Sequence, residues 1–391
     1  ATEIGVAQWQ YSASSNARKT AGPLRERPAD NASVDFMGFR YRDTSVSAPQ
    51  LALRQWQNLA NAGSVSLYIM GHLGNHQDRT ALTASKPAFD FHKAHEKLYA
   101  GLTSAAKVLL VNRPVMARND PESYGWIRAL TESHIPFDEM KLAELKPELL
   151  HRWDVVILAD LKKLTQEQAE MFDTYAEQGG TVLSTGILPE LRCLGICEVR
   201  NSWKDRMSSV FELCEAEKTL FPRSAEAHYI APGAILNEVV FCEQTQTCLH
   251  LIPEHPFGPP ERCYYTEVSD IPGVGVTPYG KGKGVCLPWL AGSFYFNEGF
   301  DNTLHLIQDV LHQICGLPEL APGLHPSVEL VLCKKTDRFL VQLINGSGVF
   351  ANSYFRPIPM QNVTLRFPGL AGKQAHTLNG GTVTVQDDGT A

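Results

Sequence analysis

Residues 107–186 constrain the fold of this chain most, because short apolar runs alternate there with amphipathic segments. The runs KVLLVNRP, WDVVILADL and GGTVLSTG have the length and composition of buried strands. One intervening segment starts with Thr165 and Gln168, the residue types of a helix capping box, and ends at Gly179. Strands that alternate with helices in this way predict a parallel α/β sheet.

The order of the elements predicts a flavodoxin-like sheet, in which ligands bind beyond the carboxyl ends of the strands. The expected strands are 107–112, a short one near Phe137, 154–159 and 181–185, and the expected helices are 121–133, 141–150, 165–178 and 304–316. An amidotransferase of this class carries its nucleophilic cysteine on a strand-to-helix elbow. No cysteine precedes Cys193, and neither G-x-G-x-x-G nor a P-loop occurs, so we expect no chemistry and no cofactor in this domain.

The nine cysteines lie between Cys193 and Cys333, without a C-x-x-C pair. This pattern predicts reduced, buried thiols rather than a zinc site or a disulfide framework. Cys193 and Cys197 are close enough in the sequence to share a helical face or to meet across a turn. The glycines of YGKGKG (279–284) lie between two strand-like runs, so we favour a hairpin there over a phosphate-binding loop.

Composition excludes several classes of protein. A chain of 391 residues usually holds two or three domains. Its net charge of −7 argues against a broad surface for nucleic acid or anionic membranes, both of which need a positive field. No apolar run approaches the length of a membrane span. The composition therefore favours neutral ligands and predicts neither nucleic acid nor membrane as a partner.

The first 105 residues have the order of a parallel α/β unit. VDFMGFRYRD predicts a strand, residues 47–61 a helix with Pro49 near its start, and VSLYIMG a second strand, followed by a helix at 80–101. Two such units cannot close a barrel. We therefore expect that part of this domain precedes Ala1.

The tail from Ser327 changes to a period of two. VELVLCKKTDRFLVQLIN predicts two strands around a Lys-Thr-Asp turn, and VTLRF and TVTVQ continue the alternation. These runs predict an antiparallel β-sandwich.

Polar and aromatic side chains follow the predicted strands of the first 105 residues, where the rim of a parallel barrel binds its ligand. The candidate site residues are Glu3, Trp9, Arg40, Arg42, Asn75, His76 and Asp78. Aromatic platforms, fixed hydrogen-bonding groups and carboxylates together suit a sugar. Structural roles compete with this interpretation: Glu3 as a solvated terminal carboxylate, Asp78 with Arg79 as a helix cap, and Arg40 with Arg42 as a loop anchor.

The order of these strings is similar to that of a known family. VDFMGFRYRD, VSLYIMGHLGNHQDR, KVLLVNRP, FGPPERCYYTEVSDIPG and the sandwich tail resemble the C-terminal part of bacterial glycoside hydrolases related to family 42 β-galactosidases. Those enzymes join a (β/α)₈ barrel to a β-galactosidase trimerisation-like domain. The resemblance implies that Glu3 is the nucleophile and that the acid/base carboxylate lies upstream of Ala1. It also implies that the middle domain serves subunit contacts.

The resemblance and the patterns together give an α/β protein with three domains. They are a barrel remnant at 1–105, a flavodoxin-like domain at 106–322 with a strand-rich insertion at about 190–290, and a β-sandwich at 323–391. The expected function is that of a glycoside hydrolase fragment, inactive as this chain, which binds carbohydrate, uses no metal or other cofactor and forms a homodimer or homotrimer. The alternative is a non-catalytic oligomerisation or carbohydrate-binding protein. A cytoplasmic location is slightly favoured.

Overall fold

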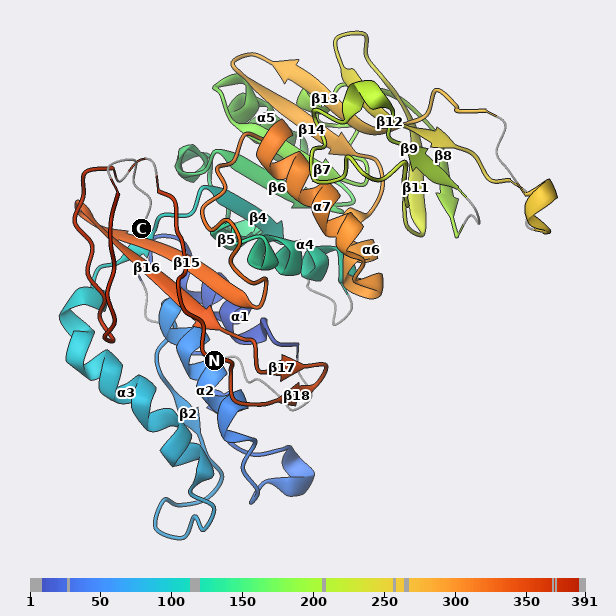
Figure 1. The fold of residues 1–391 in the computed structure, drawn as a ribbon. Coiled ribbons are helices and arrows are strands. Elements are labelled where there is room, and N and C mark those ends of the chain that lie inside the picture. Colours follow the sequence, from blue (N-terminus) through green and yellow to red (C-terminus); the bar gives the residue numbers. More distant parts are fainter. Residues whose placement is uncertain are drawn as a thin grey trace. The chain divides into compact units, whose positions relative to one another are not determined.

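A computed structural model describes the chain as two compact units (Figure 1). The structure describes residues 9–26, 29–112, 120–205, 209–255, 258–263, 267–367, 369 and 371–386. The first unit comprises 1–106, 130–139 and 318–391, and the second comprises 107–129 and 140–317. The α/β class is confirmed, with one large mixed sheet and several small sheets. The three domain boundaries stay predictions.

Most of the second unit is built on a nine-stranded sheet in the order β10-β9-β12-β13-β14-β7-β6-β4-β5, whose edge strand β5 begins in the part of the chain assigned to the first unit. Its strands are β4 (Val108–Asn112), β5 (Phe137–Lys141), β6 (Val155–Ala159), β7 (Thr181–Thr185), β9 (Val210–Glu212), β10 (Tyr229–Ile230), β12 (Gln246–Ile252), β13 (Pro272–Tyr279) and β14 (Gly282–Leu287). Strands β4, β6, β7 and β14 are parallel neighbours, which confirms the predicted parallel layer. Strands β12, β13 and β14 are antiparallel neighbours, and β13 and β14 form the hairpin predicted at YGKGKG.

Helices pack on this sheet. They are α4 (Pro121–Glu132), α5 (Gln166–Glu177), α6 (Ala291–Glu298) and α7 (Asp301–Asp309). The capping box predicted for α5 is present, since the side chain of Thr165 accepts from the Gln168 amide and that of Gln168 from the Thr165 amide. The predicted helix at 141–150 is wrong: two short 3₁₀ segments, Leu142–Glu144 and Pro147–Arg152, stand there, with Pro147 beginning the second. The helix predicted at 304–316 forms in two parts. The α-helix α7 ends at Asp309, and a π-helical turn follows over Val310–Ile314.

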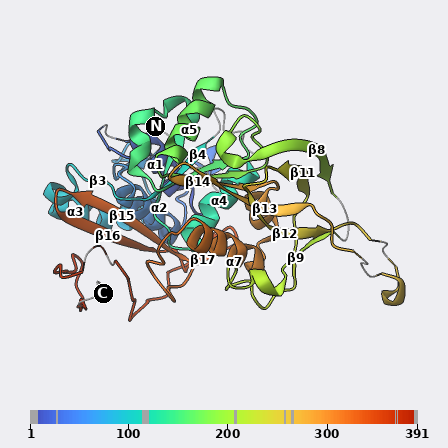
Figure 2. The same ribbon diagram turned by 90° about the horizontal axis from the view of Figure 1, so that it is seen from above.

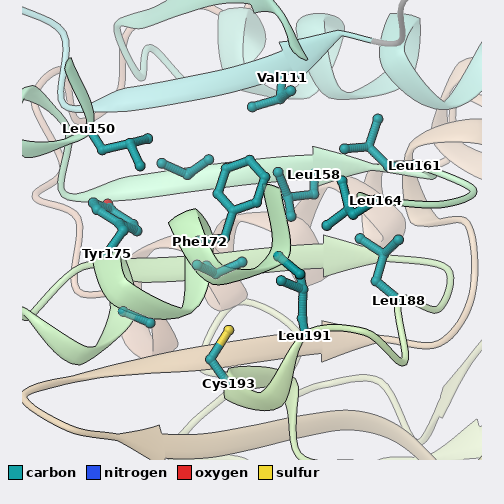
Figure 3. Close-up of a cluster of buried hydrophobic side chains, with 14 of the residues drawn as sticks. Val111, Leu150, Leu158, Leu161, Leu164, Phe172, Tyr175, Leu188, Leu191 and Cys193 are labelled. Carbon is teal, nitrogen blue, oxygen red and sulfur yellow. The ribbon is translucent and has the colours of Figure 1, made fainter. Parts of the chain in front are cut away.

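One hydrophobic core of the second unit lies between α5 and the sheet. Phe172 of α5 is completely buried among Val111 of β4, Leu158 of β6 and Leu191 of the loop after β7 (Figure 3). The thiol of Cys193 belongs to this core. Burial removes the apolar surface of these side chains from water, and this burial stabilises the unit.

A two-stranded ribbon, β8 (Ile196–Lys204) with β11 (Ile235–Phe241), forms a separate antiparallel sheet (Figure 2). A disulfide joins Cys197 to Cys242 at one end of the ribbon. The prediction that all the cysteines are reduced is therefore wrong, because the pairing depends on which strands meet and not on sequence spacing. Cys193 and Cys197 do not form a pair.

The first unit contains a short βαβ element and a long helix. Its elements are α1 (Ser12–Ala21), β1 (Ser33–Val34), α2 (Ala48–Ala60), β2 (Leu67–Tyr68), α3 (Thr80–Tyr99) and β3 (Thr103–Ser104). Strands β1 and β2 are parallel and adjacent, with α2 between them in the sequence, as predicted. The strands are much shorter than the runs VDFMGFRYRD and VSLYIMG, and a 3₁₀ turn at Phe39–Tyr41 follows β1.

The tail of the first unit forms small antiparallel sheets. They consist of β15 (Val328–Lys335), β16 (Arg338–Asn345), β17 (Val349–Phe350) and β18 (Ser353–Tyr354), and β15 also pairs with β3. The hairpin predicted around Lys-Thr-Asp is confirmed as β15–β16. No strand forms at VTLRF (363–367) or within TVTVQ (382–386) in the described part of the tail. Alternation alone therefore overestimated the sheet, because a strand also needs a neighbour that accepts its hydrogen bonds.

Candidate functional site

The parallel pair β1–β2 brings two loops to one edge of the first unit. Ser33 is paired with Leu67 and Val34 with Tyr68, so the residues that follow both strands emerge on the same side. Arg54 of α2 lies beneath this edge and is almost fully buried, and its Nη1 donates to the carbonyl oxygen of Val34 at 3.4 Å. Burial lowers the pKa of Arg54 to about 10.

Asp35 and His76 meet at this edge. Asp35 directly follows β1, His76 lies in the loop after β2, and His76 Nε2 is 3.0 Å from Asp35 Oδ2. The two side chains are only 1% and 7% exposed, respectively. Burial raises the pKa of the Asp35 carboxyl, and the neighbouring imidazole opposes that shift. A carboxyl group with a raised pKa next to an imidazole is a typical acid–base arrangement.

Asp78 holds the loops together. One of its oxygens accepts the backbone N–H of Ser45 at 2.9 Å, and the other accepts that of Thr80, the first residue of α3, at 3.0 Å. These backbone hydrogen bonds lower the pKa of Asp78 to about 2. The capping role weighed against sugar binding for Asp78 is thus present in the structure.

The other predicted rim residues, where the structure describes them, have different surroundings. Arg40, Arg42 and Asn75 are exposed, and no side-chain hydrogen bond or ion pair of theirs occurs within the described residues. Trp9 is half-buried and stacks edge to face on Tyr11, with 5.5 Å between the ring centroids. Glu3 lies outside the described residues. The structure therefore joins His76 and Asp78 to loop partners, and the roles of the remaining residues stay predictions.

A buried polar network behind α1 was missed by sequence reasoning. Ser14 of α1 donates to Glu329 of β15 at 2.6 Å, and Gln57 of α2 donates to the other oxygen of Glu329. Burial raises the pKa of Glu329, against the effect of these donors. Ser15 and Arg18 donate to Glu139, each at 2.9 Å.

The cavity beside this network is too small for a sugar. Its volume is about 20 Å³, and Arg18, Asn61 and Glu329 are among the residues that line it. A volume of this order holds about one water molecule. The network therefore fixes α1 and α2 against β15 and is not a binding site for substrate.

A sequence signal for Asp35 did exist. Asp35 is the charged residue in the apolar run VDF, where a strand is predicted, and a carboxylate in such a run is a candidate for a buried functional group. Its partner gave no comparable signal, because His76 is one of several polar residues in the loop GHLGNHQDR.

In the second unit, the carboxylate at the start of α4 has a structural role. Glu122 accepts the backbone N–H groups of Gly292 at 3.2 Å and Ser293 at 2.6 Å, and the indole N–H of Trp126 at 2.9 Å. It thereby caps α6 while buried. Among the described residues, no group of three or more His, Cys, Asp or Glu side chains is arranged to hold a metal ion. Nor does any helix in the described ranges combine the length and apolar composition that a membrane crossing requires.

Comparison with solved structures finds a similar fold in parts of several glycosidases. The α-L-fucosidase isoenzyme 2 from Paenibacillus thiaminolyticus matches with a TM-score of 0.71 and 17% identity, over 94% of this chain and 58% of that one. The β-galactosidase from Bacillus circulans sp. alkalophilus matches with a TM-score of 0.66 and 14% identity, over 98% of this chain and 57% of that one. Gan42B, a GH42 β-galactosidase from G. stearothermophilus, matches with a TM-score of 0.60 and 14% identity, over 86% of this chain and 51% of that one.

The chain thus spans little more than half the length of these enzymes. No protein-family model and no curated protein sequence matches it. At these identities the likeness concerns the fold. The chain therefore shares the fold of the corresponding parts of glycoside hydrolases.

Proposed function

We propose that this chain is part of a glycoside hydrolase and that the edge formed by β1 and β2 contributes to its sugar-binding rim. The observation that carries the proposal is the Asp35–His76 pair, buried at the carboxyl edge of two parallel strands. In barrel enzymes this edge binds the substrate. The shared fold with an α-L-fucosidase and two β-galactosidases supports the same class of reaction.

In this proposal, His76 and Asp35 position the loops after β1 and β2. Arg40, Arg42 and Asn75, with exposed side chains on these loops, supply hydrogen bonds to sugar hydroxyl groups, and Trp9 supplies an apolar platform. Glu3 is proposed as the nucleophile of a retaining mechanism. Such a mechanism needs a second carboxyl group about 5–5.5 Å away.

The proposal also requires further barrel strands. A closed barrel needs eight parallel strands, and the described residues of the first unit contain one parallel pair, β1–β2. We therefore expect the isolated chain to be inactive and the activity to belong to a protein in which other residues complete the barrel. Turnover of an aryl glycoside by the purified chain itself would contradict this part of the proposal.

The test uses a protein with a completed barrel and two substrates, 4-nitrophenyl β-D-galactoside and 4-nitrophenyl α-L-fucoside. His76→Ala is expected to reduce kcat/KM at least tenfold, because the loops after β1 and β2 lose their buried contact. His72→Ala is the matched control, since His72 is an exposed residue of the same loop, and its kcat/KM should stay within about twofold. Failure of the wild-type protein to hydrolyse any glycoside would reject the proposal.

A non-catalytic carbohydrate-binding or assembly role is the second candidate. It is favoured by the burial of the Asp35 carboxyl, which is 1% exposed and shielded from a ligand in the solvent. Titration of the chain with galactose and L-fucose separates the two roles. Saturable binding without turnover in the completed protein supports the second candidate.

A further inference from the structure

The ribbon of the second unit contains a bulge that redirects a cysteine. Ile196 of β8 pairs with Phe241 of β11, and Glu198 pairs with Val240, so Cys197 is an extra residue without a partner in the ladder. A bulge of this kind changes the direction of a side chain relative to the regular strand. The bulge at Cys197 lies next to the residue that ends β11 and leads into Cys242.

Cys197 and Cys242 form a disulfide at the surface. Cys197 is exposed and Cys242 half-buried. The backbone around Cys242 is held in place, since its N–H donates to the carbonyl oxygen of Gly195 at 2.8 Å and its own carbonyl oxygen accepts from Thr245 at 2.9 Å. A surface disulfide is open to attack by thiols, and its two sulfur atoms lie in different surroundings.

A second bulge redirects a cation. Val199 pairs with Val239 and Asn201 with Glu238, so Arg200 is the extra residue. Its guanidinium group remains partly exposed, with Nε donating to Glu198 Oε2 at 3.4 Å and Nη1 3.8 Å from Glu238 Oε1. Distances of this size leave donors of Arg200 available to a further carboxylate.

Cys242 and Arg200 both line one surface cavity of about 260 Å³. Its lining includes Arg200, Glu238, Cys242, Glu243, Thr245 and Asp270, whereas Cys197 does not line it. One cysteine of the disulfide, Cys242, therefore lines a cavity that also carries a guanidinium group and several carboxylates. This lining matches a small ligand that bears both a carboxylate and an ammonium group.

We infer that Cys242 is a site of reversible S-thiolation by a small zwitterionic thiol, namely cysteine or a short cysteine-containing peptide. The thiolate of the ligand attacks Cys242 Sγ, the bond to Cys197 breaks, and Cys197 leaves as a thiolate that takes a proton from water. One disulfide is consumed and one is formed, so this step has no net redox change. A second ligand thiolate then attacks the sulfur of the bound ligand, which yields the ligand disulfide and leaves Cys197 and Cys242 reduced.

The charged lining provides the selectivity. Arg200 binds a carboxylate of the ligand, and Glu243 and Asp270, both exposed acidic residues of the lining, attract its ammonium group. A neutral thiol of similar size has neither interaction. This inference concerns the second unit and is independent of the proposed hydrolase function.

The experiment compares two variants of the full chain that both lack the disulfide, Cys197→Ser and Cys242→Ser. Each is incubated with oxidised glutathione, quenched with N-ethylmaleimide and digested, and mass spectrometry locates the adduct among the remaining cysteines. Cys242 in the first variant is expected to react at least tenfold faster than Cys197 in the second. Equal rates, or faster reaction of Cys197, would overturn the inference.

Charge selectivity is tested with bis(2-hydroxyethyl) disulfide, a neutral reagent, for which the two rates should agree within about threefold. Adding Arg200→Met to the Cys197→Ser variant should slow the reaction with glutathione at least fivefold and leave that with the neutral reagent unchanged.

A measurement on the wild-type chain does not depend on the folding of any variant. After brief exposure to reduced glutathione and a rapid quench, the mixed disulfide should be found on Cys242, and its presence on Cys197 instead would reject the inference.

Discussion

His76 Nε2 lies 3.0 Å from Asp35 Oδ2, so a residue of the loop after β2 is held against the residue that directly follows β1. This contact connects the two loops that the parallel strands bring to one edge. Its strength is measurable as stability, separately from any catalytic activity.

His76→Ala is expected to destabilise the first unit by about 2–3 kcal/mol, because the buried Asp35 carboxyl loses its neighbour. Urea denaturation gives the free energy of unfolding. His72→Ala is the control and should change it by less than ~0.5 kcal/mol, since His72 is exposed. Adding Asp35→Asn to His76→Ala should recover part of the loss, and a further loss of stability in that double variant would contradict the pairing.

Asp78→Ala is expected to cost about 1 kcal/mol at pH 7, because the N–H groups of Ser45 and Thr80 lose their acceptor. The pKa of Asp78 is lowered to about 2 in the folded protein. The contribution of the Asp78 carboxylate to the free energy of unfolding is therefore complete above the unfolded pKa of about 3.9, and it is lost as the pH falls toward about 2. The difference in stability between wild type and variant, measured by denaturation from pH 7 to pH 2, should shrink as the pH approaches 2. Asp43→Ala, at an exposed residue, should show no such difference at any pH.

Glu329→Gln is expected to flatten part of the pH profile of stability. The folded-state pKa of Glu329 is raised by burial, so the folded protein holds this proton more tightly than the unfolded chain. Stability then falls as the pH rises from the unfolded pKa, about 4.3, through the raised folded pKa. The wild type should lose stability across that window relative to the neutral variant. Exposed Glu148→Gln serves as the control, and parallel profiles for Glu329→Gln and wild type would refute the prediction.

Gly125→Ala is expected to destabilise the second unit by about 3 kcal/mol through overpacking. A Cβ atom on Gly125 of α4 would lie 1.8 Å from the carbonyl oxygen of Gly292 in α6, so the two helices would have to separate. Gly74→Ala is the matched substitution, because no atom lies within 4 Å of the added carbon there. Thermal unfolding should show a clear loss for the first variant and a change of less than ~0.5 kcal/mol for the second. Equal melting temperatures would contradict the close packing.

The elements of the parallel sheet could be predicted from the sequence because their signals are local. The runs that form β4, β6 and β7 are apolar over the whole strand, as expected when both faces are buried, and the Thr165–Gln168 capping box marks the start of α5. The same reasoning failed for 141–150, where helical spacing was interrupted by Pro147. It also failed at 363–367 and 382–386, where alternation was present but no partner strand was.

The sequence by itself determined the α/β class, the order of the main elements and the region in which a sugar rim is proposed. Only the tertiary structure decided that Asp35 faces His76 and that Cys197 is bonded to Cys242. Periodicity and capping depend on residues within a few positions of one another, so a single sequence shows them. Contacts between distant residues depend on strand register and bulges, and a shift of one residue redirects every side chain, which no local pattern specifies.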